Sequence, residues 1–263
     1  MPRLTILPSP SPQVVLTQYD GALFPKFQLL FEKQDESSPL RHLALSPEDA
    51  AVALVLENRS EKAITALRWR WQKMDASGKV RSNACSSDSY IVDAFRAVAE
   101  PGSRRLLGSS ANLDEAIIEH VLHGGGVTSA RGGGSSFLEN VDEPTFAIDL
   151  ILFADGEIAG PDPEKYTLEL QLRKPAAEFV ARHIRLAHAE GRDAAPVLSA
   201  LAELPNFVYP GYGRHSSHIY WIRRYASQYL HHWHAKVGEQ VRREAGLRHL
   251  ESRPELPKFY RKE

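Results

Sequence analysis

The chain has 263 residues, of which 43% are hydrophobic and 25% are charged, a composition typical of globular proteins. Its formal net charge of −1 does not favour nucleic acid or an acidic partner for the chain as a whole. The single cysteine, Cys85, excludes a disulfide framework and a cysteine zinc cluster. Because no apolar run reaches the roughly 18 residues of a membrane span, we expect a soluble, cytoplasmic protein with no membrane contact.

Residues 1–13 are predicted to form an extended arm. The prolines Pro8, Pro10 and Pro12 alternate with serines, and this favours a polyproline-like backbone. A ligand for a proline-recognition domain would place its prolines three residues apart. The spacing of two therefore indicates an ordinary surface arm.

Residues 14–160 carry mainly the signals of short strands. In the clearest of them, Trp69 and Trp71 alternate with Arg68 and Arg70, which places the tryptophans on one face and the arginines on the other. Turn residues punctuate the region at intervals, as expected for a sheet protein. The pattern predicts a β-sandwich-like domain.

Two further features belong to the same region. Large apolar residues recur at every second position at Phe146, Ile148, Leu150 and Leu152, and they lead to Asp155-Gly156, a strong signal for a tight turn. Residues 112–123 instead have helical spacing, with Asn112 as a candidate cap and Gly124 as a candidate stop. The expected domain is therefore mainly β with one helix.

The glycine-rich loop at 124–136 invites a chemical interpretation. His123 and the three glycines after it match the oxyanion motif of some lipases, but the chain lacks the Gly-x-Ser-x-Gly sequence that carries their nucleophile. The phosphate-binding glycine patterns also fail in this loop. We expect a connecting loop, in which Arg131 is the lone cation and a candidate contact to a ligand or partner.

Residues 161–250 are predicted to form a helical domain. Asp162 and Pro163 suit a helix start, and apolar residues then recur at helical spacing as far as Gly191. Pro175 would kink this helix. Residues 163–174 also alternate as a strand would, so both interpretations stay open there.

Two more helices are expected in this domain. A short one should lie near 196–204, and a long one should begin near 216 and end before Gly246. Residues 251–263 are predicted to form a tail. Residues 206–263 hold eleven Lys and Arg against five Glu, a net charge of +6, which leaves −7 for the rest of the chain.

One face of the last long helix is a candidate binding surface. It consists of Trp221, Arg224, Tyr225, Gln228 and His232. Aromatic residues beside arginines are typical anchors of protein interfaces, although the same stripe would also suit packing inside the protein. The neighbouring histidines point around the helix in different directions, so we expect no metal site and no cofactor.

Two stretches together resemble known proteins. LENRSEKAITALRWRW with DASGK resembles the strand-turn-strand openings of bacterial β-sandwich modules, and LILFADGEIAGPD before a long helix resembles a segment of uncharacterised bacterial proteins. The resemblance implies a β-sandwich-plus-helix protein. It implies no activity, because it rests on turn and cap residues.

The sequence therefore predicts an α+β protein that acts as a non-catalytic binding or interaction module, with a protein partner or a second copy of itself. No catalytic residue is assigned. An enzyme whose site forms only on folding is the first alternative, and its candidates are His120, His123, Arg131, Cys85 and Asp155. Nucleic-acid binding through the basic C-terminal helix is the second, although Glu239, Glu244 and Glu251 interrupt the basic run.

Overall fold

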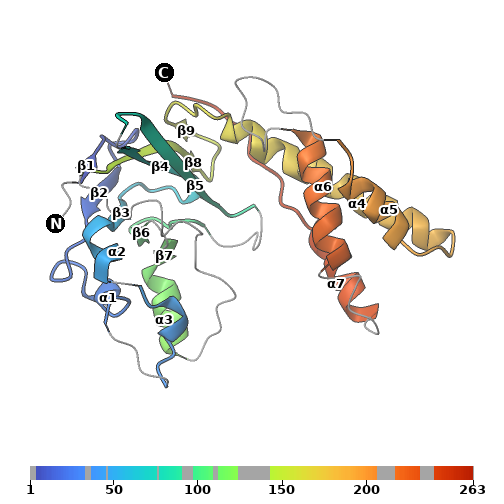
Figure 1. Ribbon diagram of the computed structural model, residues 1–263, viewed down its shortest axis with the longest axis horizontal. Helices are drawn as coiled ribbons and strands as arrows, with labels where there is room; N and C mark the ends of the chain where they lie inside the picture. Colours follow the sequence, from blue (N-terminus) through green and yellow to red (C-terminus); the bar gives the residue numbers. More distant parts are fainter. Residues whose placement is uncertain are drawn as a thin grey trace. The chain divides into compact units, whose positions relative to one another are not determined.

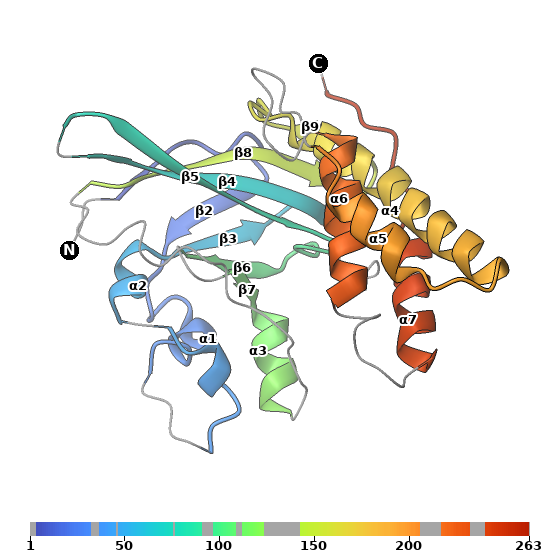
Figure 2. The ribbon, with the colours of Figure 1, turned by 45° about the vertical axis from the view of Figure 1, so that its right-hand side comes forward.

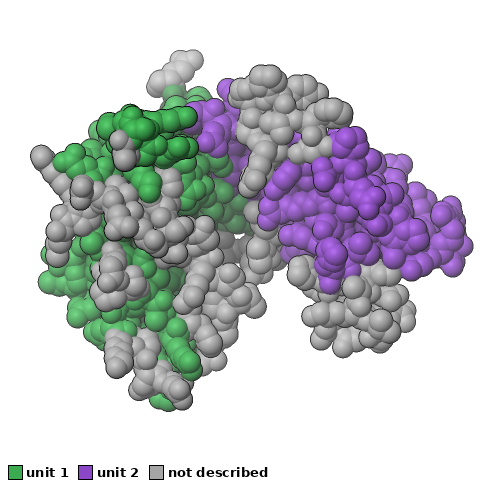
Figure 3. All heavy atoms as spheres, in the orientation of Figure 1, with its two compact units in different colours: residues 1–89, 95–161, 258–263 green, residues 90–94, 162–257 purple. Residues whose placement is uncertain are grey.

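The computed structural model describes residues 4–32, 37–45, 47–75, 77–90, 97–108, 112–123, 143–205, 217–231 and 240–262. The protein is α+β, as the sequence predicts, and divides into two compact units (Figure 3). The β unit comprises residues 1–89, 95–161 and 258–263, and the helical unit comprises residues 90–94 and 162–257. The finer expectation of a β-sandwich stays a prediction.

The β unit contains two sheets (Figure 1). In the first, the strands follow the order β1 (Thr5–Ile6), β8 (Thr145–Phe153), β4 (Ile64–Met74) and β5 (Val80–Asp88), and β9 (Ile158–Ala159) also pairs with β8. β1 runs parallel to β8, while the other pairs are antiparallel. Part of the expected N-terminal arm is thus a short strand of this sheet.

The second sheet is antiparallel, in the order β2 (Val14–Gln18), β3 (Leu54–Asn58), β6 (Arg104–Leu107) and β7 (Asn112–Asp114). Buried side chains of both sheets form one apolar cluster, which includes Leu54 and Leu56 of β3 and Phe146 of β8. Trp69 and Trp71 both lie in this cluster, as their alternation predicts. The two tryptophans therefore help to join the sheets.

Short helices accompany the second sheet. They are α1 (Pro25–Gln28), the 3-10 helix η1 (Arg41–Leu43), α2 (Pro47–Val52) and α3 (Glu115–Leu122). Phe27 of α1 and Ile118 of α3 pack with Val55 and Leu106 of the sheet in a second apolar cluster. The expected helix at 112–123 begins only at Glu115, because residues 112–114 pair with β6 as a strand.

The helical unit consists of α4 (Tyr166–Ala189), α5 (Ala195–Ala202), α6 (His218–Tyr229) and α7 (Gln240–Glu251) (Figure 2). Apolar residues from all four helices form its core, among them Val180, Leu198, Ile222 and Leu247. No helix among the residues described above is long and apolar enough to cross a membrane.

The helices differ from the sequence prediction at several points. The ambiguous stretch 163–174 is helical from Tyr166 onward, and α4 continues past Pro175 to Ala189. Asp162 caps this helix from outside it, since its carboxylate accepts the N–H groups of Tyr166 and Thr167 at 2.6 and 3.1 Å. The expected end before Gly246 is wrong, because α7 runs through this glycine to Glu251.

Gly160 lies at the end of the β unit, just before the chain enters the helical unit. Its φ is +104°, a backbone conformation that favours glycine. A Cβ atom on this residue would lie only 2.5 Å from the carbonyl oxygen of Asp149. Glycine is therefore required here both by conformation and by space.

Candidate segment-binding site

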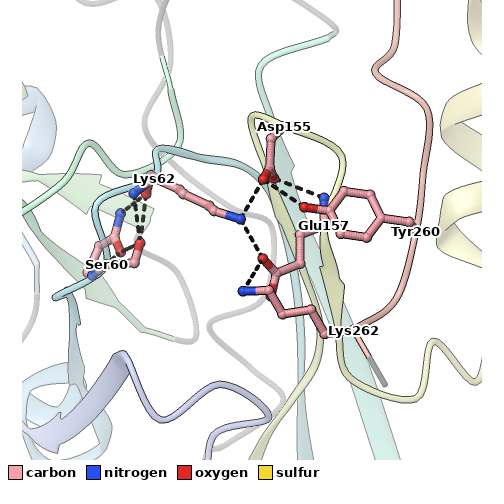
Figure 4. A network of polar contacts seen from close by, with 7 residues as sticks. Ser60, Lys62, Asp155, Glu157, Tyr260 and Lys262 are labelled. Atoms are coloured by element: carbon pink, nitrogen blue, oxygen red, sulfur yellow. Dashed lines mark hydrogen bonds and ion pairs between the residues drawn. The ribbon is translucent and has the colours of Figure 1, made fainter.

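The site begins with the hairpin that joins β8 to β9. The N–H of Phe153 donates to the carbonyl of Glu157 at 2.9 Å, and that of Gly156 donates back to Phe153 at 3.0 Å. Gly156 has a φ of +94°. The tight turn predicted at Asp155-Gly156 is thus present, and it brings the carboxylates of Asp155 and Glu157 to the same end of the hairpin (Figure 4).

Lys62 lies between these two carboxylates. Its Nζ forms an ion pair with Asp155 and donates to Oε2 of Glu157 at 2.6 Å (Figure 4). Lys62 comes from the connection between β3 and β4, where the carbonyl of Lys62 accepts Nδ2 of Asn58 at 2.9 Å and Oγ of Ser60 at 2.8 Å. Asn58 and Ser60 are buried, so the turn that carries Lys62 is well ordered by its own hydrogen bonds.

Residues 258–262 add a strand-like segment to the hairpin. Tyr260 forms a parallel bridge with Glu157. The N–H of Ile158 donates to the carbonyl of Tyr260 at 2.8 Å, and the N–H of Tyr260 donates to the carbonyl of Gly156 at 3.0 Å. The sequence predicts a tail at 251–263, whereas the structure continues α7 to Glu251 and places 258–262 against the β unit.

Three successive side chains of this segment also contact the hairpin. The hydroxyl of Tyr260 donates to Oδ2 of Asp155 at 2.8 Å, and Nζ of Lys262 lies 2.9 Å from Oε2 of Glu157. The guanidinium of Arg261 donates to the carbonyl of Gly160. The hairpin end and Gly160 therefore contact the backbone of this segment, the phenol of Tyr260 and the two cations that follow it.

The charges of the site are held in their ionised forms. Partial burial acts to raise the pKa of Asp155, but the hydrogen bonds from Lys62, the Glu157 N–H and Tyr260 outweigh it and lower this pKa to about 2. The pKa of Glu157 is lowered as well, since Lys62 and Lys262 outweigh the effect of burial. Hydrogen bonds to Asp155 and then Glu157 raise the pKa of Lys62.

The phenol of Tyr260 completes this arrangement. Its hydrogen bond to Asp155, followed by burial, raises the pKa of Tyr260. At neutral pH the shifted pKa values keep two carboxylates, the cationic Lys62 and a neutral phenol at the site.

The predicted interface residues lie in different environments. Trp221 and Tyr225 are buried in the core of the helical unit. The guanidinium of Arg173 lies 4.5 Å from the ring centroid of Trp221, and that of Arg224 lies 5.2 Å from it. Arg224 and Gln228 are exposed. The remaining predicted positions, His232 and the loop residue Arg131 with 124–136, lie outside the described residues.

The residues considered for an enzyme come from separate elements. His120 and His123 are exposed at α3, Cys85 packs against the core from β5, and Asp155 is at the hairpin end. Burial raises the pKa of the Cys85 thiol. Within the described ranges no hydrogen bond or ion pair joins any two of these four residues, and no group of three potential metal ligands occurs there.

Sequence reasoning missed most of the site. The sequence points to Asp155 as a turn residue and as a candidate of the enzyme alternative, but it does not single out Lys62, Glu157, Tyr260 or Lys262. Lys62 and Tyr260 are far apart in the chain, and no periodicity links them. The local signals are the two aromatic residues among three cations in KFYRK and the acidic turn DGE, and nothing in the sequence pairs these two stretches.

Comparisons with known proteins add no further constraint. No protein-family model, no curated protein and no solved structure matches this chain.

Proposed function

We propose that this protein is a non-catalytic interaction module whose β unit binds an extended polypeptide segment at the end of the β8–β9 hairpin. The observation that carries the proposal is the docking of residues 258–262 on Asp155, Glu157 and the backbone between them. Addition of an extended segment to exposed backbone groups is a recurrent mode of peptide recognition. In that mode the main chain supplies affinity and the side chains supply specificity.

The chemistry of the ligand follows from the partners within the site. Asp155 accepts a phenolic hydroxyl, the carbonyl of Gly160 accepts a guanidinium, and Glu157 pairs with an ammonium group two residues after the phenol. The proposed ligand is therefore an extended basic segment that contains tyrosine. Lys62 keeps both carboxylates in position and ionised, which reduces the ordering that binding would otherwise require.

A peptide-binding experiment tests this function in the full chain. The double variant Tyr260→Ala/Lys262→Ala removes the side chains that fill the site and leaves Lys62, Asp155 and Glu157 intact. A fluorescein-labelled peptide with the sequence PKFYRK should bind this variant saturably in an anisotropy titration. We expect a Kd below about 1 mM, which corresponds to roughly −4 kcal/mol.

Two matched controls define specificity. A peptide with glutamate in place of its last lysine should bind roughly 10-fold more weakly, because it would face Glu157 with a like charge. The same loss is expected for the native peptide when Asp155→Asn and Glu157→Gln are added to the double variant. Equal affinity of both peptides, or no saturable binding of the native one, would reject the proposed function.

A further inference from the structure

The contact between residues 258–262 and the hairpin end is exposed. The side chain of Lys262 is 65% accessible to solvent, and Tyr260 is 41% accessible. Exposed ion pairs contribute little to stability, and the segment makes one bridge with the hairpin. Such a contact opens locally at a far smaller cost than unfolding of the unit, so its occupant can exchange.

The receiving side of the contact has internal support that is independent of the segment. Lys62 pairs with Asp155 and Glu157 from within the β unit. The N–H of Glu157 donates to Oδ1 of Asp155 at 3.0 Å, which orients that carboxylate. Departure of Tyr260 and Lys262 therefore leaves an ordered acidic acceptor at the hairpin end.

The chain before the segment is suited to carry it outward. Residues 253–259 have no helix or strand, and they include Pro254 and Pro257. Prolines favour an extended backbone of about 3.1 Å per residue. Arg253 fixes the start of this stretch, because it is buried, donates to the carbonyl of Tyr90 at 3.1 Å and lies 5.0 Å from the ring centroid of Tyr225.

We infer that the hairpin end of one copy also accepts residues 258–262 of a second copy, so that two copies exchange these segments in a symmetric dimer. This inference rests on the proposed function and names its partner. Every copy carries both the acceptor and a segment known to fit it, and reciprocal exchange reproduces the same contacts in each half of the dimer. The helical unit need not be rebuilt, since Arg253 stays in place.

Protein concentration governs the balance between the two arrangements. A segment tethered by a short flexible linker competes with an effective concentration on the order of millimolar. The exchanged dimer should therefore grow as the protein concentration rises from about 0.05 to 1 mM.

Two complementary full-length variants test the exchange. Asp155→Asn/Glu157→Gln damages the acceptor and keeps the segment, whereas Tyr260→Ala/Lys262→Ala damages the segment and keeps the acceptor. In sedimentation velocity, each variant alone should remain monomeric at concentrations where the native chain dimerises. An equimolar mixture of the two should regain dimers, because one intact acceptor meets one intact segment. The unlabelled peptide PKFYRK in excess should reduce the dimer fraction at least about 5-fold.

The outcomes separate this inference from the proposed function. In one outcome the labelled peptide binds the acceptor, but the native chain and the mixture of variants both stay monomeric up to 1 mM. The site then serves segments of other proteins, and the exchange is wrong. If the peptide does not bind, both proposals are wrong. Dimers that persist equally in each variant alone would also overturn the exchange, since they would form through another surface.

Discussion

The hydroxyl of Tyr260 donates a hydrogen bond of 2.8 Å to Oδ2 of Asp155, across 105 positions of the sequence. The helical unit, residues 162–257, lies between these two residues in the chain. The β unit thus combines residues that precede the helical unit in the sequence with residues that follow it. Substitution of either Tyr260 or Asp155 should therefore weaken the docking of residues 258–262 on the hairpin.

Tyr260→Phe should loosen the docked segment without unfolding the β unit. The variant removes the hydrogen bond to a charged acceptor and keeps the ring. We expect hydrogen exchange at the N–H groups of Ile158 and residue 260 to quicken roughly 3- to 10-fold. Tyr220→Phe, which removes another tyrosine hydroxyl from α6, is the matched control and should leave both rates unchanged.

Acid should release the segment over a defined range of pH. In the docked state the pKa of Asp155 is lowered from 3.8 to about 2 and that of Glu157 is lowered as well, and the segment supplies part of these shifts through Tyr260 and Lys262, beside Lys62. A lowered pKa stabilises the docked form above the ordinary value, and this contribution is lost as pH falls from there toward the lowered value. Exchange at Ile158 should accordingly be slow relative to the unfolded chain near pH 6 and lose this protection below about pH 4.

Alkaline pH should also weaken docking, because the contribution of Tyr260 is lost as pH rises. The pKa of Tyr260 is raised above 10.0 by its hydrogen bond to Asp155 and then by burial. The contribution of its neutral phenol is present below pH 10 and is lost as pH rises through the raised value. An absorbance titration should show one tyrosine ionising later in the native chain than in Asp155→Asn, and identical titrations would contradict the contact.

Local sequence signals predicted much of the fold. Alternation placed Trp69 and Trp71 in the apolar core, and Asp155-Gly156 predicted the hairpin that presents the acidic end of the site. These features depend on neighbours a few residues away, which periodicity and turn chemistry report. The α+β class followed from the same signals.

Long-range pairing could not be predicted in this way. Asn112 looked like a helix cap, but residues 112–114 pair with β6, so tertiary contacts override the local preference. Residues 258–262 looked like a tail because a single bridge leaves no period-2 pattern in the sequence. Trp221 and Tyr225 matched an interface stripe, yet aromatic residues at helical spacing are equally suited to the core in which they lie.

Gly160→Ala should destabilise the β unit far more than an open glycine would. Its Cβ would meet the carbonyl oxygen of Asp149 at 2.5 Å, and its φ of +104° is unfavourable for alanine. Strain of this kind costs of order 1–3 kcal/mol before any clash is counted. Gly191→Ala is the control, because Gly191 has a φ of +66° and nothing within 4 Å of the added atom. Equal midpoints in urea for the two variants would show that the close approach to Asp149 is absent.

The affinity of the basic C-terminal region for nucleic acid should depend only weakly on salt concentration. Arg253 donates to Tyr90, Arg261 to Gly160, and Lys262 pairs with Glu157, so these cations are engaged within the chain. Strong binding to phosphates releases counterions and falls linearly with the logarithm of salt concentration. We expect a slope shallower than about −2 for duplex DNA and single-stranded RNA in filter-binding assays. A slope near −5 would favour the nucleic-acid alternative over a protein-interaction module.

The helical unit should depend on one buried ion pair. Glu169 and Arg173 are a turn apart on α4, and both are nearly inaccessible to solvent. Glu169→Ala leaves the guanidinium buried beside the rings of Tyr166 and Trp221 without its carboxylate, which should cost about 3–5 kcal/mol of unfolding free energy. Replacing both members, as in Glu169→Leu/Arg173→Met, should recover most of this loss because no charge is then buried.

The exposed pair of Arg185 with Glu251 provides the comparison, and Arg185→Ala should cost less than about 1 kcal/mol. Urea denaturation followed by tryptophan fluorescence measures all three, and a double variant as unstable as Glu169→Ala would show that packing, and not the buried charge, sets the cost.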